Sequence, residues 1–224
     1  MKLGAHQLQY FPGLRFFSKM KSSELFIYLD DVQYARREFQ NRNRIRSVSG
    51  WQYLTVPVLA KGKFSQTINE TEIETAADWR NAHLKALAVN YSRAKYFRDY
   101  APALEKIYSR NYARLAEIAL ETMEFLRSAF GIKTPVKFSS GFGLASASTQ
   151  RLVDLCKVSG ADEYLSGAGG KSYLDESLFD RSGIKLSWQD FKVLPYPQAF
   201  KGFEPDMSAL DLLLNCGPES VRYL

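Results

Sequence analysis

A strand, a Gly/Pro loop, a helix and a second strand follow one another at the start of the chain. Residues 2–6 open as a short strand, and Pro12 and Gly13 mark the loop behind it. Residues 14–20 repeat apolar side chains at helical spacing, and residues 24–29 form an aromatic-rich run typical of a buried strand. This order is the opening of a parallel α/β sheet. We therefore expect an α/β fold with a Rossmann-like, mostly parallel sheet.

The rest of the chain adds a hairpin and a helical portion to this sheet. Ser49 and Gly50 mark the hairpin turn, and Asp78 and Ser148 are expected to cap helices. We expect one domain over residues 1–224, with its helical portion at about 78–131. The predicted strands lie at 66–74, 134–139, 163–166 and 184–188, the inserted β-hairpin at 44–58, and the helices at 78–91, 102–130, 148–160 and 208–214.

The composition is that of a globular protein with a mild preference for anionic ligands. The chain has 224 residues, of which 46% are hydrophobic, and its net charge is +6, which does not single out nucleic acid. Cys156 and Cys216 match no metal-ligand spacing, so no metal site is predicted from them. The residues after Met1 turn polar too early for a signal peptide, and no apolar run is long enough to span a membrane. We therefore expect a cytoplasmic protein.

Two carboxylates, Asp30 and Asp31, come directly after the strand predicted at residues 24–29. Open α/β sheets bind their ligands at the carboxyl ends of strands. A carboxylate there could hold Mg²⁺ or orient an amine. Because side chains alternate along a strand, we expect only one of the two in the site, in a cleft shared with His6 and Lys171. The alternative is a pair of surface aspartates.

The next stretch is dense in side chains with planar hydrogen-bonding ends, among them Gln33, Asn41, Arg42 and Asn43. Such groups match phosphates and sugar hydroxyls. On an extended segment Asn41 and Asn43 face one way and Arg42 the other. We expect one face to read a sugar while the arginine reaches a phosphate or a buried carboxylate. The alternative is a solvated basic connection.

A glycine-rich segment, Gly167, Gly169 and Gly170 followed by Lys171, resembles a phosphate cradle behind a predicted strand. Glycines let backbone amides approach an anion, and lysine adds a charge. The spacing is neither that of a Walker motif nor GxGxxG. A glycine turn at a domain corner is the alternative.

Both histidines are candidate acid–base residues, because histidine has an ordinary pKa near neutrality. His6 ends the first predicted strand, at the edge of the sheet where ligands bind. His83 lies on the apolar stripe of a helix together with Trp79 and Leu87. For each of them the alternative is a hydrogen-bonded packing residue.

One family likeness rests on blocks spread along nearly the whole chain. The blocks are His6 and Gln7 with Tyr10 and Pro12, residues 29–34, 39–43 and 51–58, residues 79–91 with His83, residues 164–175 with Gly167, Gly169, Gly170, Lys171 and Tyr173, and residues 210–217. With these blocks in this order, the chain resembles the WbqC family. The resemblance implies a product of a bacterial surface-polysaccharide gene cluster that attaches an amino acid such as glycine to an amino sugar.

A more distant resemblance concerns only the opening strand, loop, helix and strand. Nucleotidylyltransferases and pantothenate-synthetase-like ligases begin in this way and hold ATP phosphates with a His-x-Gly-His motif at the helix start. Residues 12–17 of this chain contain no histidine. If the likeness extends to ATP, Lys171 and His6 would have to supply the missing charges. The cofactor is therefore left open, with ATP and Mg²⁺ as the candidates.

The residues and the resemblance together predict an enzyme of surface-polysaccharide (O-antigen) biosynthesis. It would be an acyl or aminoacyl transferase, or an ATP-dependent amide ligase, acting on an amino sugar on a nucleotide carrier. Its catalytic candidates are His6, Asp30, Asp31 and His83. Its ligand-binding candidates are Gln7, Tyr10, Gln33, Asn41, Arg42, Asn43, Gly167, Gly169, Gly170, Lys171 and Tyr173.

Two alternatives to this prediction stay open. A non-catalytic sugar-nucleotide or regulatory binding protein would keep ligand affinity without turnover. A nucleic-acid-binding protein would lose affinity steeply with salt, and we do not expect nucleic acid as the partner. The expected partner is a small nucleotide or sugar-nucleotide ligand, and the oligomeric state is left open.

Overall fold

The computed structural model describes all of residues 1–224, and it divides into two compact units that each combine several stretches of the chain. The sheet unit consists of Met1–Gln7, Arg15–Asp31 and Ile132–Lys192. The hairpin unit consists of Leu8–Leu14, Val32–Gly131 and Val193–Leu224.

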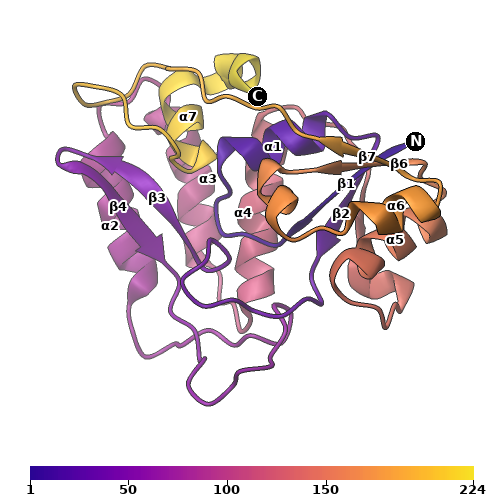
Figure 1. The fold of residues 1–224 in the computed structure, drawn as a ribbon. Helices are drawn as coiled ribbons and strands as arrows, with labels where there is room; N and C mark the ends of the chain where they lie inside the picture. Colours follow the sequence, from indigo (N-terminus) through magenta and orange to yellow (C-terminus); the bar gives the residue numbers. More distant parts are fainter. The chain divides into compact units, whose positions relative to one another are not determined.

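The sheet unit is built on five strands that all run parallel (Figure 1). They are β1 (Lys2–Gln7), β2 (Leu25–Leu29), β5 (Val136–Phe138), β6 (Glu163–Ser166) and β7 (Lys185–Trp188), in the order β5-β2-β1-β6-β7. The predicted α/β class and parallel sheet are confirmed. The apolar run that predicted β2 is buried along nearly its whole length, as expected for a strand covered on both faces.

The strand order reverses at β1. The chain passes from β1 to β2 and β5 on one side, and then crosses to β6 and β7 on the other. Gly4 of β1 is in register with Phe26 of β2 and with Leu165 of β6. At such a reversal, the chain segments that leave the carboxyl ends of the two neighbouring strands run in opposite directions, and a crevice opens between them. Open α/β sheets bind their ligands in this crevice. In this chain, that place is the carboxyl end of β1 beside β6.

The sheet unit also contains three helices, α1 (Leu14–Lys21), α5 (Ser148–Ser159) and α6 (Glu176–Arg181). Two short 3₁₀ turns, η1 (Ser139–Phe142) and η2 (Ala168–Ser172), follow β5 and β6. The core joins apolar strand residues to α5 and α6; its members include Leu3, Ile27, Val153, Leu155 and Phe179. Gly160 closes α5 with a left-handed backbone, as expected. The predicted cap is wrong by one position, because Ser148 is the first helical residue and Ala147 precedes it.

The hairpin unit contains the inserted β-hairpin that the sequence predicts. Its strands β3 (Arg42–Ser47) and β4 (Gly50–Thr55) pair antiparallel, and the unit also contains α2 (Trp79–Tyr91), α3 (Phe97–Ser109), α4 (Leu115–Ala129), α7 (Ala209–Cys216) and η3 (Gly217–Tyr223). The strand expected at residues 66–74 is wrong. That segment makes only isolated bridges, at Thr67, Glu72 and Ile73.

The single helix expected at residues 102–130 is also wrong, because two helices cover this part of the chain. Arg110 leaves α3 with an extended backbone, and α4 begins at Leu115. The Glu117 carboxylate accepts hydrogen bonds from the Ala113 and Arg114 amides at 2.7 and 3.0 Å, which fixes the start of α4. Residues 110–114 contain neither Gly nor Pro. The helical spacing of apolar residues therefore continued across the break, and no residue indicated that the helix ends there.

None of the helices combines the length and the apolar character that crossing a membrane requires.

Candidate functional site

A cavity of about 760 Å³ lies within the sheet unit where the strand order reverses. His6 and Gln7 line it from the end of β1, and residues 166–170 line it from the end of β6. Residues 189–192, which follow β7, and the first turns of α1 complete the wall. Leu29, the last residue of β2, also lines the cavity, so the carboxyl ends of four of the five strands open into one space. This is the expected position of a ligand site in an open α/β sheet.

Lys19 is one of the cavity residues that were not predicted from the sequence. Its side chain, 5% exposed, belongs to α1 and lines the cavity. The ammonium donates to the Ala5 carbonyl at 2.6 Å and lies 5.9 Å from the centre of the Phe26 ring, but no carboxylate pairs with it. Because burial disfavours the charged form, the pKa of Lys19 is lowered to about 7. One sequence feature could have predicted this burial, because Lys19 comes three residues after Phe16 and therefore lies on an apolar face of the helix.

His6 lines the same cavity and is neutral at physiological pH. Burial, and then the nearby charge of Lys19, lower the pKa of His6 to about 3. Its Nδ1 lies 3.1 Å from the Gln7 carbonyl oxygen, which can only accept, so Nδ1 carries the proton. The Nε2 atom then holds the free lone pair and has no hydrogen-bond partner in the protein. The ring packs edge-on against Phe16, with centroids 5.2 Å apart.

The glycines after β6 divide into two kinds. A Cβ added at Gly167 or Gly169 would meet nothing within 4 Å, so these positions leave the backbone open where they line the cavity. A Cβ at Gly170 would overlap Ser166 Oγ and would lie 3.0 Å from the Trp188 ring. Gly170 is therefore required for packing, whereas Gly167 and Gly169 let a ligand approach the main chain.

Lys171 and Tyr173 follow these glycines and differ in position. Tyr173 lines the cavity and is 72% exposed. Lys171 does not line the cavity, and its ammonium lies 5.6 Å from the centre of the Trp188 ring. The cationic side chains in the wall are instead Arg15, Lys19 and Lys192.

Asp30 and Asp31 follow β2 at the carboxyl edge of the sheet, as expected, but neither lines the cavity with His6. Asp30 accepts hydrogen bonds from the Ser140 amide at 3.0 Å and the Ser140 hydroxyl at 2.6 Å. Asp31 pairs with Arg151 of α5 and accepts a hydrogen bond from the Ser139 hydroxyl. These contacts hold η1 and α5 to the end of β2. Their role in chemistry stays a prediction.

The residues are not arranged for a metal site. No group of three or more His, Cys, Asp or Glu side chains is placed to hold a metal ion. The two carboxylates that were candidates for Mg²⁺ already bind serine and arginine partners. The residues therefore do not fit the ion, and we derive no step through Mg²⁺ or through ATP bound by it.

The planar side chains expected to read a sugar belong to the hairpin unit and bond to its backbone. The expected alternation is confirmed, since Asn41 and Asn43 are buried and Arg42 is partly exposed. Asn41 donates to the Val56 carbonyl at 2.8 Å, Asn43 to the Phe11 carbonyl at 2.7 Å, and Gln33 to the Phe64 carbonyl at 2.8 Å. These amide donors hold segments of the hairpin unit together, so their use in ligand binding stays a prediction.

Tyr10 and His83 form a buried cluster within the hairpin unit. The Tyr10 hydroxyl lies 2.9 Å from His83 Nδ1 and also bonds to Tyr108, and Trp79 packs edge-on against His83. Burial lowers the pKa of His83 to about 4. This arrangement matches the packing alternative for His83.

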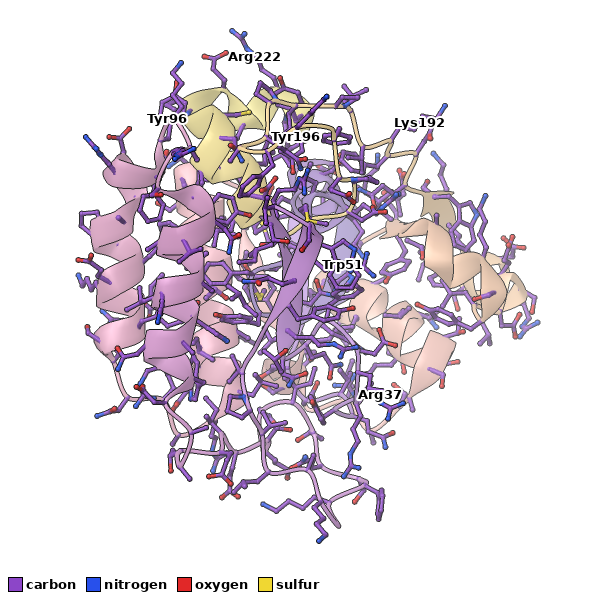
Figure 2. The ribbon with its side chains drawn as sticks, turned by 90° about the vertical axis from the view of Figure 1, so that its left-hand side faces the viewer. Arg37, Trp51, Tyr96, Lys192, Tyr196 and Arg222 are labelled. Atoms are coloured by element: carbon purple, nitrogen blue, oxygen red, sulfur yellow. The ribbon has the colours of Figure 1, made fainter.

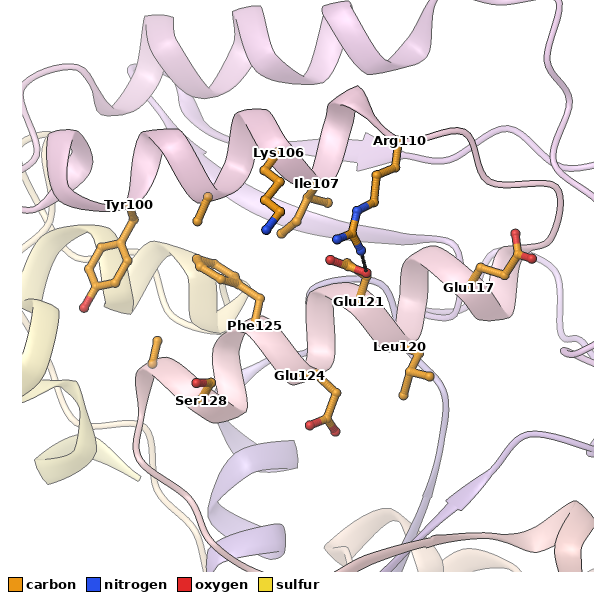
Figure 3. A pocket seen from close by; sticks show the side chains of 12 residues that line it. Tyr100, Lys106, Ile107, Arg110, Glu117, Leu120, Glu121, Glu124, Phe125 and Ser128 are labelled. Carbon is orange, nitrogen blue, oxygen red and sulfur yellow. Dashed lines mark hydrogen bonds and ion pairs between the residues drawn. The ribbon is translucent and has the colours of Figure 1, made fainter.

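A second hollow, of about 640 Å³, lies between α3 and α4 in the hairpin unit (Figure 3). Arg110 and Glu121 face each other there and form an ion pair of 2.6 Å. Glu124 pairs with Arg127, and Glu117 caps α4. Most charged groups of this hollow therefore have protein partners, whereas the Lys19 ammonium is buried without a carboxylate partner. We place the candidate site in the cavity of the sheet unit.

Comparison with known proteins identifies the family. The model of the WbqC-like protein family matches residues 7–223. An uncharacterized protein of Mycobacterium tuberculosis (strain ATCC 25618 / H37Rv), Rv1507c, is 40% identical over 225 residues, covering 100% of this chain and 97% of that protein. No solved structure matches the chain. The chain therefore belongs to the WbqC-like protein family.

Proposed function

We propose that this protein is an enzyme of bacterial surface-polysaccharide biosynthesis that joins an acyl or aminoacyl group, such as glycine, to an amino sugar on a nucleotide carrier. Its membership of the WbqC-like family supports the pathway. The cavity at the reversal of the strand order supports a small-molecule substrate. The cytoplasmic location expected from the sequence belongs to this proposal.

The observation that carries the proposal is the buried Lys19 without a carboxylate partner. Burying an ammonium is costly unless it is paired, and one carbonyl oxygen satisfies only one of its three donors. An anionic group bound in the cavity would complete the site. Arg15 and Lys192 in the wall and the open main chain at Gly167 and Gly169 favour the same kind of ligand, a phosphate or a carboxylate.

In this proposal His6 is the general base. The amine of the sugar attacks the carbonyl carbon of an activated acyl donor, a C–N bond forms, and the bond to the leaving group breaks. The proton lost by the amine moves to Nε2 of His6, which holds a free lone pair. An anion beside Lys19 would offset the charge that lowers the pKa of His6, so ligand binding would make His6 a stronger base.

Ligand binding tests the site. We expect a UDP-linked amino sugar to bind the wild type, and Lys19→Met to weaken this binding by about tenfold or more, since one cation contact to an anion is worth roughly 1.5–3 kcal/mol. Lys21→Met, an exposed lysine on the same helix, is the matched control. Equal affinity of the Lys19→Met protein and the wild type in calorimetric titration would contradict the proposed site.

Turnover tests the activity separately. The amino-sugar nucleotide is mixed with a glycyl or acetyl thioester, and the product is detected as the mass gained by the sugar. We expect His6→Gln to abolish product formation while ligand affinity stays within about twofold, since glutamine cannot accept the proton. Binding without turnover in the wild type, across a panel of acyl donors, would instead favour the non-catalytic binding protein.

A further inference from the structure

The outer face of the β3–β4 hairpin carries a row of arginines paired with aromatic rings. Residues 42, 44 and 46 of β3 lie opposite residues 55, 53 and 51 of β4. The Arg42 guanidinium lies 4.4 Å from the centre of the Tyr53 ring, and that of Arg44 lies 4.4 Å from the Trp51 ring. These distances place each guanidinium in contact with a ring.

The arginines of this row differ in their partners. Arg46 is 3% exposed and donates to three carbonyl oxygens, those of Ser47, Gly50 and Lys201. Because the protein itself satisfies these donors, we assign Arg46 a structural role. The side chain of Arg44 makes no hydrogen bond and no ion pair, and its Nε is shielded from solvent without an acceptor. It contacts rings only, namely Trp51, Tyr53 and Phe39.

An arginine held between rings without an acceptor is prepared for an external anion. The planar fork of a guanidinium binds phosphate or carboxylate oxygens through two parallel hydrogen bonds, and the rings fix its orientation before the ligand arrives. No acidic side chain pairs with Arg42 or Arg44, so the face is complementary to negative charge. Arg42 uses one of its donors on the Arg37 carbonyl, and its Nε, like that of Arg44, is shielded from solvent without an acceptor.

The rings beside Arg44 are themselves accessible. Trp51, labelled beside the hairpin in Figure 2, is 41% exposed, and Phe39 is 36% exposed. Flat aromatic faces next to a phosphate-binding arginine favour a ligand that carries both a planar ring and a phosphate. We propose that this face binds a nucleoside phosphate, with the phosphate on Arg44 and the base stacked on Trp51. None of these residues lines the cavity of the sheet unit, and the inference does not depend on the proposed activity.

The fluorescence of Trp51 provides a local readout. Replacing Trp79 and Trp188 by phenylalanine leaves Trp51 as the only one of the three tryptophans, and UDP is then titrated. We expect UDP to quench the fluorescence, and Arg44→Lys to weaken binding about tenfold because lysine lacks the stacked fork. Arg222→Lys is the matched control, since this exposed arginine pairs with Glu219 away from the hairpin. Calorimetry on the chain with all three tryptophans repeats the comparison.

Uridine and pyrophosphate separate the two contacts. We expect both to bind more weakly than UDP, and Trp51→Leu to weaken UDP binding while leaving pyrophosphate binding unchanged. Equal affinity of Arg44→Lys and the wild type for UDP would overturn the inference. So would pyrophosphate binding as tightly as UDP, because the stacked base would then contribute nothing. Because Lys19→Met acts on the cavity, its effect on the UDP-linked amino sugar distinguishes failure of this site from failure of the proposed function.

Discussion

Replacing Lys19 by methionine should make the protein more stable at neutral pH. The folded protein lowers the pKa of this ammonium from 10.5 to about 7 because it is buried without a counter-charge. That change corresponds to about 4–5 kcal/mol, since each pKa unit is worth about 1.4 kcal/mol. Methionine also loses the hydrogen bond to the Ala5 carbonyl, at about 1–2 kcal/mol. The net expectation at pH 7 is a gain of about 2–4 kcal/mol in the free energy of unfolding.

The pH dependence gives the sign of this effect. Between the folded pKa of Lys19, about 7, and its unfolded pKa, 10.5, the unfolded chain binds more protons than the folded protein. The free energy of unfolding of the wild type should therefore rise with pH across this range. In Lys19→Met this contribution is absent, so the stabilities of the two proteins should converge as the pH approaches 10.

Urea unfolding followed by circular dichroism at pH 6, 7, 8, 9 and 10 measures both quantities. Lys21→Met, an exposed change on the same helix, should alter stability by less than about 0.5 kcal/mol at every pH. A Lys19→Met protein that is less stable than the wild type at pH 7, and that keeps the same pH dependence, would refute the reasoning. It would mean that the ammonium of Lys19 is solvated rather than buried in the wall of the cavity.

Substitutions at three other positions test whether a residue is needed for packing, for ligand binding or for buried hydrogen bonds. Gly170→Ala should destabilise the protein by about 1–3 kcal/mol, because its Cβ overlaps tightly packed neighbours. Gly169→Ala should leave the melting temperature unchanged but weaken ligand binding, and equal melting temperatures of the two variants would contradict this division. Asp211→Ala should cost about 3–5 kcal/mol in urea unfolding, because the buried hydroxyls of Tyr91 and Tyr196 both lose their acceptor. A loss below about 1 kcal/mol would show that the two hydroxyls find other partners.

The order of the helices and strands could be predicted from the sequence, because the residues that each element buries are apolar and recur at the spacing of that element. The apolar run of residues 25–29 is β2. The glycine at position 160 ends α5, and residues 163–166 are β6. The break after Ser109 could not be read, because it depends on a capping carboxylate and not on a helix-breaking residue.

The position of the candidate site could be predicted from the sequence only in part. His6 and the glycines after β6 were found because strand ends are marked by local composition. Their meeting in one cavity follows from the pairing of β6 with β1, which no local pattern specifies. One of Asp30 and Asp31 was expected in that cavity. Instead, Ser140, which is 110 residues further along the chain, binds the Asp30 carboxylate, and Arg151 pairs with Asp31.

The α/β class, the hairpin and the strand ends can be predicted from local sequence, because hydrophobic spacing and turn residues act over a few neighbouring positions. Which carboxylates are held by protein partners, and which lysine is buried, depends on how distant segments of the chain pack together. Lys19 looks like an ordinary cation of a short helix until the sheet and α1 enclose it. Its low pKa is a property of that enclosure, since desolvation depends on every segment packed around the group and not on its neighbours in sequence.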